Sequence, residues 1–444
     1  MLKLWLALVL CLCSAAAAVA APGVTDTSLQ VQEIVSGLNT PTTMAFIGPD
    51  DILVLEKNTG RVRRVLNGAL QSAPVLDVNV DTTSERGMLG IAVHPNFPAS
   101  SFVYLYFTES TSNASDTSGS PAGNRVYRYI WNSGSGTLES PLLIQDLPAT
   151  PGPNHDGGVI AFGPDGKLYI VIGDLNRSGK LQNNSDGAAP DDTSVILRLN
   201  DDGTASNDNP FFAQGGALQK YYAYGIRNSF GLAFDPFTDK LWDTENGPNS
   251  YDEINLMEPG FNSGWNKIMG PDSRDPQNVG DLFAIPDSHY ADPKFSWLNP
   301  VGVTAIAFLD TDALGVQYQG DVFIGDVNNG RIYRFQLNGA RNGFILVGAL
   351  ADGVADNNGE LSQLIFASGF SGVTDLKVGP DGRLYVVSIG DGRIYAITAA
   401  PRFSDSTSLP NAEVGAMYNK AMSIEGGVSP YIVALAGGSL PAGP

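Results

Sequence analysis

The chain has 444 residues, and its 26 Lys and Arg against 46 Asp and Glu give a formal net charge of −20 at pH 7. A field of that sign repels phosphate backbones and argues against a nucleic acid partner. The 51 Gly and 28 Pro stand between short runs of aliphatic and aromatic residues, a composition typical of many short strands joined by turns and not of long helices.

Residues 1–21 have the pattern of a secretory signal peptide. Lys3 precedes an apolar run, and small residues end the segment near Ala20 or Ala21, where we expect cleavage. The apolar run is too short for a good membrane span. We therefore expect a secreted or periplasmic protein without a membrane anchor. Both cysteines, Cys11 and Cys13, lie in this segment, so the mature chain would contain no disulfide.

Residues 28–400 contain one pattern six times. It consists of an apolar triplet, a turn often written GPDG, an apolar strand, a second turn and an amphipathic strand often written GRIYR. The triplets begin at Met44, Ile91, Ile160, Leu232, Ile306 and Leu376. Their spacing suits one four-stranded blade plus loops, so the sequence predicts an all-β fold, a six-bladed β-propeller of four-stranded antiparallel blades.

The fourth strand of each blade is less regular in sequence. We expect it near Ser72, Leu142 and Gln363 in three of the blades. We also expect residues 28–35 to pair with the last blade, because closing the ring in this way protects the strand edges that an open sheet would expose.

Antiparallel topology sorts the loops of each blade between two faces. The GPDG-type turn lies on one face, while the segment before strand one and the turn after strand two lie on the other. The segments expected on this second face are polar or rich in Gly, and they are residues 85–87, 154–156, 174, 227–228, 245–248 and 326–329. We expect a ligand to bind where they converge on the axis.

His155 and Asp174 belong to the same predicted blade and to the same rim. The carboxylate can accept a hydrogen bond from one imidazole nitrogen and leave the other nitrogen free as a base. A histidine in an NHDGG loop can equally cap turn amides, so both interpretations stay open.

Two further segments offer binding groups. Arg227 and Asn228 can bind a carboxylate or a quinone oxygen, although Arg227 can also pair with a neighbouring blade. The carbonyls of Gly247 and Pro248 precede an acidic run that includes Glu253, and calcium prefers hard oxygens of this kind. Acidic loops without metal are nevertheless common.

Several motifs occur together and in a fixed order: RGMLGIAVHPNF, NHDGG, FGPDGKLYIVIGD, YAYGIRNSFGLAFDP and TENGPNSYDEINLMEPGFNSGW. From about residue 30 to 400 they resemble the glucose/sorbosone dehydrogenase family, whose members are soluble six-bladed propellers that use pyrroloquinoline quinone (PQQ) and calcium. The resemblance implies that His155 is the general base and that Asp174 orients it. It also implies that Arg227 and Asn228 bind the cofactor.

The same resemblance implies that the Gly247 and Pro248 carbonyls hold the calcium ion, with Glu253 beside them, and it loosely places Trp297 over the cofactor plane. Two rim positions depart from the family pattern. Asn328 lies in a loop where the family often has a lysine, and Thr374 lies where it often has arginines. We keep Asn328 among the predicted cofactor contacts and add Arg86, which stands where many members have an uncharged residue.

After residue 400 the propeller pattern ends. Residues 401–444 contain the motifs GGVSPY and GSLPAG, which resemble the start of a bacterial Ig-like repeat.

The sequence therefore predicts an exported quinoprotein that oxidises an aldose or a related sugar and passes electrons to an external acceptor. One alternative is a propeller that has lost its cofactor and binds a glycan or a protein, because rim cations are missing. A second alternative, a calcium-dependent lactone hydrolase, is disfavoured because the motifs match the dehydrogenases.

Overall fold

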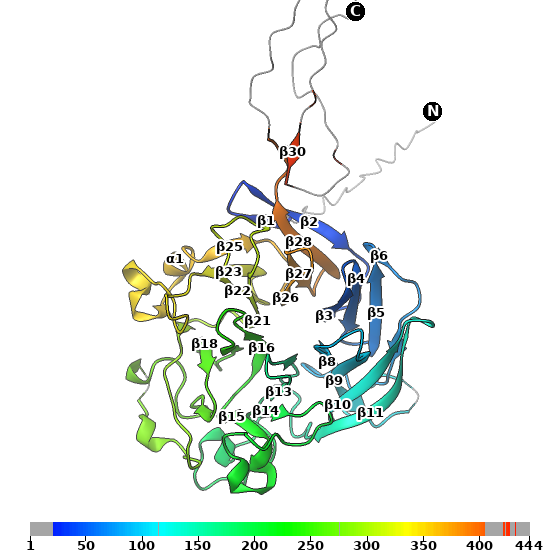
Figure 1. The fold of residues 1–444 in the computed structure, drawn as a ribbon. Coiled ribbons are helices and arrows are strands. Elements are labelled where there is room, and N and C mark those ends of the chain that lie inside the picture. The colour runs from blue at the N-terminus through cyan, green and yellow to red at the C-terminus, as the bar shows by residue number, and fades with distance from the viewer. Residues whose placement is uncertain are drawn as a thin grey trace, which may run out of the picture.

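A computed structural model describes residues 21–113, 115–274, 276–404, 421, 423–426 and 431. Six sheets of four or five strands surround a central axis (Figure 1), which confirms the predicted six-bladed propeller. The proposed signal peptide lies outside the described residues except for Ala21. Most of the predicted Ig-like tail also lies outside them. In the described part of the chain, no helix is both long and apolar enough to cross a membrane.

Each of the first three blades starts with an inner strand at the axis. Their strands are β3 (Pro41–Gly48), β4 (Asp51–Glu56), β5 (Arg61–Leu66), β6 (Ala69–Leu70) and β7 (Leu76–Asp77) in blade one; β8 (Met88–Val93), β9 (Phe102–Ser110), β10 (Pro121–Asn132) and β11 (Thr137–Leu147) in blade two; and β12 (Ile160–Phe162), β13 (Leu168–Ile172), β14 (Val195–Leu199), β15 (Tyr221–Tyr224) and β19 (Phe261–Asn262) in blade three.

Blades four to six follow the same plan. Their strands are β16 (Ser229–Phe234), β17 (Leu241–Glu245), β18 (Asp252–Met257), β20 (Phe295–Trp297) and β24 (Val354–Ala355) in blade four; β21 (Val303–Phe308), β22 (Val322–Asp326), β23 (Arg331–Phe335), β25 (Ile365–Ser368) and β1 (Gly23–Val24) in blade five; and β26 (Val373–Val378), β27 (Leu384–Ser388), β28 (Arg393–Ala399) and β2 (Leu29–Val35) in blade six. The short helix α1 (Asn358–Leu361) and the hairpin of β29 (Arg402–Phe403) with β30 (Ile424–Glu425) lie outside the six sheets. Among the described residues, six 3₁₀ turns lie in the loops: Lys180–Gln182, Phe212–Gln214, Gly216–Lys220, Asp272–Arg274, Val279–Asp281 and Gly348–Asp352.

The ring closes as the sequence predicts. Strand β2 pairs antiparallel with β28, from Leu29 opposite Ala399 to Val35 opposite Ile394. The N-terminal part of the chain thus completes the last blade and covers the edge of β28.

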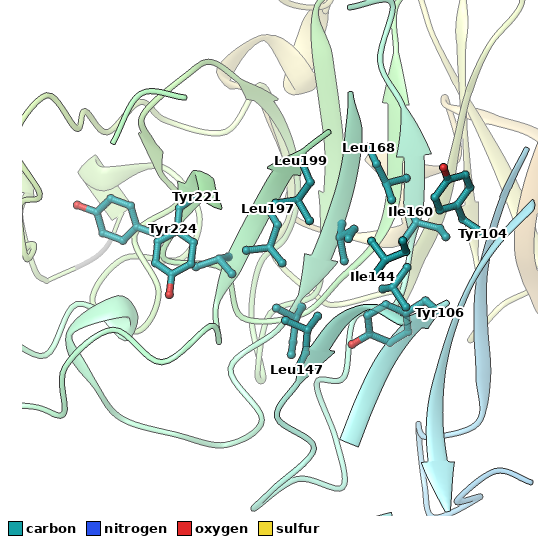
Figure 2. Close-up of a cluster of buried hydrophobic side chains, with 14 of the residues drawn as sticks. Tyr104, Tyr106, Ile144, Leu147, Ile160, Leu168, Leu197, Leu199, Tyr221 and Tyr224 are labelled. Atoms are coloured by element: carbon teal, nitrogen blue, oxygen red, sulfur yellow. The ribbon is translucent and has the colours of Figure 1, made fainter. Parts of the chain in front are cut away.

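The core consists of one hydrophobic cluster between each pair of neighbouring blades. Figure 2 shows the cluster between blades two and three, where Tyr104 and Tyr106 lie near Ile160 and Leu168. Because side chains alternate along a strand, β9 turns Tyr104 and Tyr106 toward blade three, whereas its neighbouring residues pack toward blade one. Each central strand is therefore buried on both faces and reads as a continuous apolar run.

The two ends of the axis differ. Phe46, Phe162 and Phe234, which end the apolar triplets, line a cavity at one end together with Pro164 of a GPDG turn. A second cavity is lined by Lys57, which follows strand β4, and by residues that precede inner strands. The loops are sorted between two faces as the topology predicts, and the candidate site lies on the second face.

Candidate functional site

The central pair of the site is His155 and Asp174. His155 lies in the loop between β11 and β12, and Asp174 follows β13, which pairs with β12. This arrangement brings Nδ1 of His155 to 2.6 Å from Oδ1 of Asp174. The side chains are almost buried, with relative exposures of 8% and 2% for the two residues. None of the described residues bonds to Nε2, so one ring nitrogen remains free to accept a proton.

The loop that carries His155 is fixed by its backbone. His155 has a φ of 66°, in the left-handed region that residues with a Cβ rarely occupy. Its amide donates to Oε2 of Glu85 at 2.7 Å, which helps to hold this conformation. At Gly157 a Cβ would lie 2.7 Å from the carbonyl oxygen of Val171, so a glycine is required where the loop crosses β13.

Asp174 is held by two further donors. Its Oδ1 also accepts from the amide of Asn176 at 2.7 Å, and its Oδ2 accepts from Nε1 of Trp265 at 2.6 Å. The guanidinium of Arg227 lies 5.3 Å from the centre of the Trp265 ring, a cation–π distance. Sequence reasoning missed Trp265, and the only available signal was its place in the motif GFNSGW.

Arg227 and Asn228 lie between β15 and β16. Nη1 of Arg227 donates to the carbonyls of Asn246 and Gly247 at 2.9 and 3.0 Å. Nδ2 of Asn228 donates to Glu85 at 3.0 Å. Nε of Arg227 and Oδ1 of Asn228 are buried and have no hydrogen-bond partner in the described part of the chain. Burial lowers the pKa of Arg227, and the two unpaired atoms are available to a polar ligand.

The loop of Gly247 and Pro248 joins β17 to β18. The Gly247 amide donates to Oδ1 of Asp252 at 3.0 Å, and Oδ2 of Asp252 accepts from three backbone amides at the start of blade five. A Cβ at position 247 would lie 2.1 Å from the carbonyl oxygen of Ser250. The loop is therefore tight, with the Gly247 carbonyl directed at Arg227 and Pro248 exposed.

Glu253 lies within the blade rather than on its loop. It stands in β18 opposite Glu245 of β17, and both residues are buried. Glu253 accepts from the amide of Gly270. Burial raises the pKa of Glu245 to about 7 and raises that of Glu253 well above its ordinary value. In the described part of the chain, no three His, Cys, Asp or Glu side chains form a metal-binding set, so calcium here would depend on carbonyl oxygens.

Glu85 and Gly157, which contact or adjoin the His155 loop, line a cavity of about 290 Å³ on the axis. Its wall includes the ionisable residues Lys57 and Glu85 and the apolar residues Leu89, Val159, Phe230 and Val327. Sequence reasoning also missed Lys57. Lys57 directly follows the second strand of blade one, as Asp174 nearly does in blade three. Because the turn after a second strand is expected on the ligand-binding face, the topology alone predicts this position for Lys57.

Comparison with known proteins identifies the family. The chain matches the family profile described as Glucose / Sorbosone dehydrogenase over residues 38–396. The chain belongs to this family. Aldose sugar dehydrogenase YliI of Escherichia coli K12 is 27% identical over 367 residues, which cover 81% of this chain and 90% of that protein.

Two further proteins are similar to this chain. Quinoprotein glucose dehydrogenase B of Acinetobacter calcoaceticus is 34% identical over 256 residues, covering 53% of this chain and 52% of that protein. The crystal structure of an oxidoreductase assigned as a glucose dehydrogenase, from Thermus thermophilus, has 30% identity and a TM-score of 0.64. That match covers 83% of this chain and 99% of the other.

Three of the predicted cofactor contacts, Arg86, Trp297 and Asn328, are not among the residues that line the cavity. Arg86 is 3% exposed, and its guanidinium donates to the carbonyl of Ala149 and lies 3.6 Å from Asp81, so it supports the segment before His155. Trp297 is 1% exposed within the cluster between blades four and five, and its burial there leaves no ring face open to a ligand. Asn328 is exposed in the loop between β22 and β23.

Proposed function

We propose that this member of the glucose/sorbosone dehydrogenase family is a PQQ-dependent sugar dehydrogenase in which His155 is the general base. The observation that carries the proposal is the 2.6 Å contact between His155 and Asp174, which leaves Nε2 free. The names of the two curated relatives, an aldose sugar dehydrogenase and a quinoprotein glucose dehydrogenase, support the substrate class and the cofactor.

The residues at the mouth fit such a cofactor. Arg227 and Asn228 each have a buried polar atom without a partner in the described part of the chain. Nε of Arg227 can donate to a quinone or carboxylate oxygen, and Oδ1 of Asn228 can accept from an N–H or O–H group of a ligand. The carbonyls of Gly247 and Pro248 are hard oxygens that would hold calcium once Arg227 gives up its bond to Gly247. When bound beside calcium, the quinone supplies an electrophile that accepts a hydride.

The protein's part of the reaction is proton transfer and orientation. Nε2 of His155 takes the proton of the anomeric hydroxyl while the hydrogen on the same carbon leaves as hydride, so the sugar loses two electrons and becomes a lactone. Asp174 accepts from Nδ1 and stabilises the charged ring. General base catalysis of this kind contributes about 10²- to 10⁴-fold to the rate.

Trp265 fixes the position of the Asp174 carboxylate, and the apolar wall of Leu89, Val159 and Phe230 limits water at the reacting carbon. We further propose that the protein works outside the cytoplasm and passes electrons to an external acceptor. The signal-like pattern of residues 1–21 supports export.

Reconstitution tests the proposal directly. Purified protein is incubated with PQQ and Ca²⁺, and the quinone absorbance and the reduction of an artificial dye are followed with a panel of aldoses. We expect a bound-quinone spectrum that bleaches on addition of a sugar, and dye reduction that depends on both additions. If quinone binds to no detectable extent and no aldose reduces the dye, the proposal is wrong.

A further inference from the structure

The cavity at the mouth is lined by two lysines with different surroundings. Nζ of Lys377 lies 3.3 Å from Oδ1 of Asp375, so this lysine has a counter-ion. Nζ of Lys57 instead donates to neutral oxygens, the carbonyl of Ser84 at 2.7 Å and Oδ1 of Asn58 at 3.2 Å. Among the described residues, no carboxylate lies within the 4.0 Å ion-pair distance of Lys57.

The carboxylates nearest to Lys57 already have donors. Oε2 of Glu85 accepts two hydrogen bonds, and Asp81 lies 3.6 Å from Arg86. Burial lowers the pKa of Lys57, while the charges of Glu85, Asp156 and Asp81 act in the opposite direction. These charges favour the protonated ammonium, and one of its three N–H groups has no assigned protein acceptor.

On the opposite wall of the cavity, the positive charge of Lys377 in blade six is paired with Asp375. Blades five and six also contribute the uncharged residues Val327, Thr374 and Ile389. Arg227 is bound to the carbonyls of residues 246 and 247. Within the described lining of the cavity, Lys57 is therefore the cation that lacks a carboxylate partner.

We propose that Lys57 is a cofactor-binding residue whose ammonium pairs with a carboxylate of the quinone. It would supply, from the wall of blades one and two, a charge that Asn328 and Thr374 cannot supply from blades five and six. PQQ carries three carboxylates, and a charge-assisted hydrogen bond to one of them satisfies the free N–H of Lys57. This inference rests on the proposed function, because it assumes that the cavity takes the quinone.

Direct binding measurements test the role of Lys57 without relying on turnover. The dissociation constant of PQQ is measured by tryptophan fluorescence in saturating Ca²⁺ for wild type, Lys57→Gln and Lys57→Arg. We expect the Gln variant to bind about 10- to 100-fold more weakly, in line with the loss of one charge-assisted contact. The Arg variant should stay much closer to wild type. The affinity of wild type should fall more steeply with ionic strength than that of Lys57→Gln.

A matched control separates this local contact from a change in net charge. Lys240→Gln removes the same charge from the opposite face, where Nζ donates to the carbonyl of Ala340, and it should bind PQQ as wild type does. Circular dichroism and melting curves check the fold of each variant. If the Gln variant does not fold, the methyl esters of PQQ replace it as the probe. Wild type should then lose affinity for the ester that removes the paired carboxylate.

The outcomes distinguish the two proposals. If wild type binds no quinone, the proposed function itself fails. If wild type binds PQQ and a folded Lys57→Gln variant binds it equally well, only the assignment of Lys57 is overturned. Equal affinity of wild type for PQQ and for every ester would overturn it as well.

Discussion

Blades three and six share one strand pattern and carry different rims. Their GPDG turns form the same hydrogen bonds: Gly163 donates to the carbonyl of Lys167 and Gly379 to that of Arg383, both at 2.9 Å. Their second strands, LYIVI and LYVVS, are fully buried. At the opposite end, however, blade three presents His155 and Asp174, whereas blade six presents Thr374 and Ile389 to the cavity.

The difference shows which parts of the repeat belong to the fold. The turn and the buried strand recur because each blade must bury both of its faces against neighbouring blades. This requirement does not depend on the residues at the rim. The rim segments have no such constraint and differ in both residue type and length. If this division is correct, substitutions on the two rims should have very unequal effects on activity, and substitutions in the two turns should have similar effects on stability.

The largest effect is expected on the rim of blade three. His155→Gln keeps a polar side chain of similar size but removes the base, so kcat of the reconstituted enzyme should fall about 10²- to 10⁴-fold. The affinity for PQQ should change little. Thr374→Val on the rim of blade six is the counterpart and should retain kcat within about two-fold. Equal losses in the two variants would contradict the comparison.

The next largest effect is expected for Asp174→Asn. The carboxylate accepts from His155, from the Asn176 amide and from Trp265, and a neutral amide can neither accept all three bonds equally nor stabilise a charged imidazole. We expect kcat to fall about 10- to 10³-fold, less than for loss of the base itself. Steady-state kinetics across pH 5–9 would show this. A kcat equal to that of wild type would remove Asp174 from its positioning role.

Sequence reasoning placed His155 and Asp174 together because both residues lie within one blade. The repeat fixed the position of each strand, and antiparallel topology then placed His155 and Asp174 on the same rim. Trp265 was missed because it reaches Asp174 from 91 residues further along the chain, in a segment outside the repeat. Trp297 shows the converse problem, since a motif alone does not distinguish a buried aromatic residue from one that faces a ligand.

Arg86 illustrates the same limit for a charged residue. Its partners include Asp81, the Ala149 carbonyl and Asp156, whose Oδ1 lies 3.9 Å from Nε of Arg86. Asp81 lies in the same loop as Arg86, whereas Ala149 and Asp156 lie in the loop between β11 and β12, which only the folded ring brings close to it. A sequence pattern can place Arg86 at the rim, but it cannot show that the side chain turns inward.

A third prediction concerns stability at the rim of blade three. Burial raises the pKa of Asp156 from 3.8 to about 7, so between these values the folded state binds this proton more tightly than the unfolded state. The free energy of unfolding should therefore decrease as pH rises from about 4 to about 7, by on the order of 2 kcal/mol from this group. Urea unfolding at pH 4.5 and 7.5 measures the change. Asp156→Asn should reduce the change of the free energy of unfolding with pH. An equal change in the variant and in wild type would show that other groups cause it.

The smallest effects are expected in the turns that blades three and six share. Oδ1 of Asp165 accepts from the Lys167 amide at 3.0 Å, and Oδ1 of Asp381 accepts from the Arg383 amide at 3.1 Å. The second oxygen of each carboxylate accepts from the hydroxyl of Tyr169 or Tyr385 and from a neighbouring arginine. Asp165→Ala and Asp381→Ala should each cost about 1 to 2 kcal/mol in the free energy of unfolding.

Neither turn variant should alter kcat, because both turns lie at the end of the axis opposite the His155 pair. Chemical denaturation and steady-state kinetics on the same preparations would test the two expectations together. A loss of activity in Asp165→Ala without one in Asp381→Ala would show that the turn of blade three serves its rim. In blade three, the turn and the rim would then not be independent of each other.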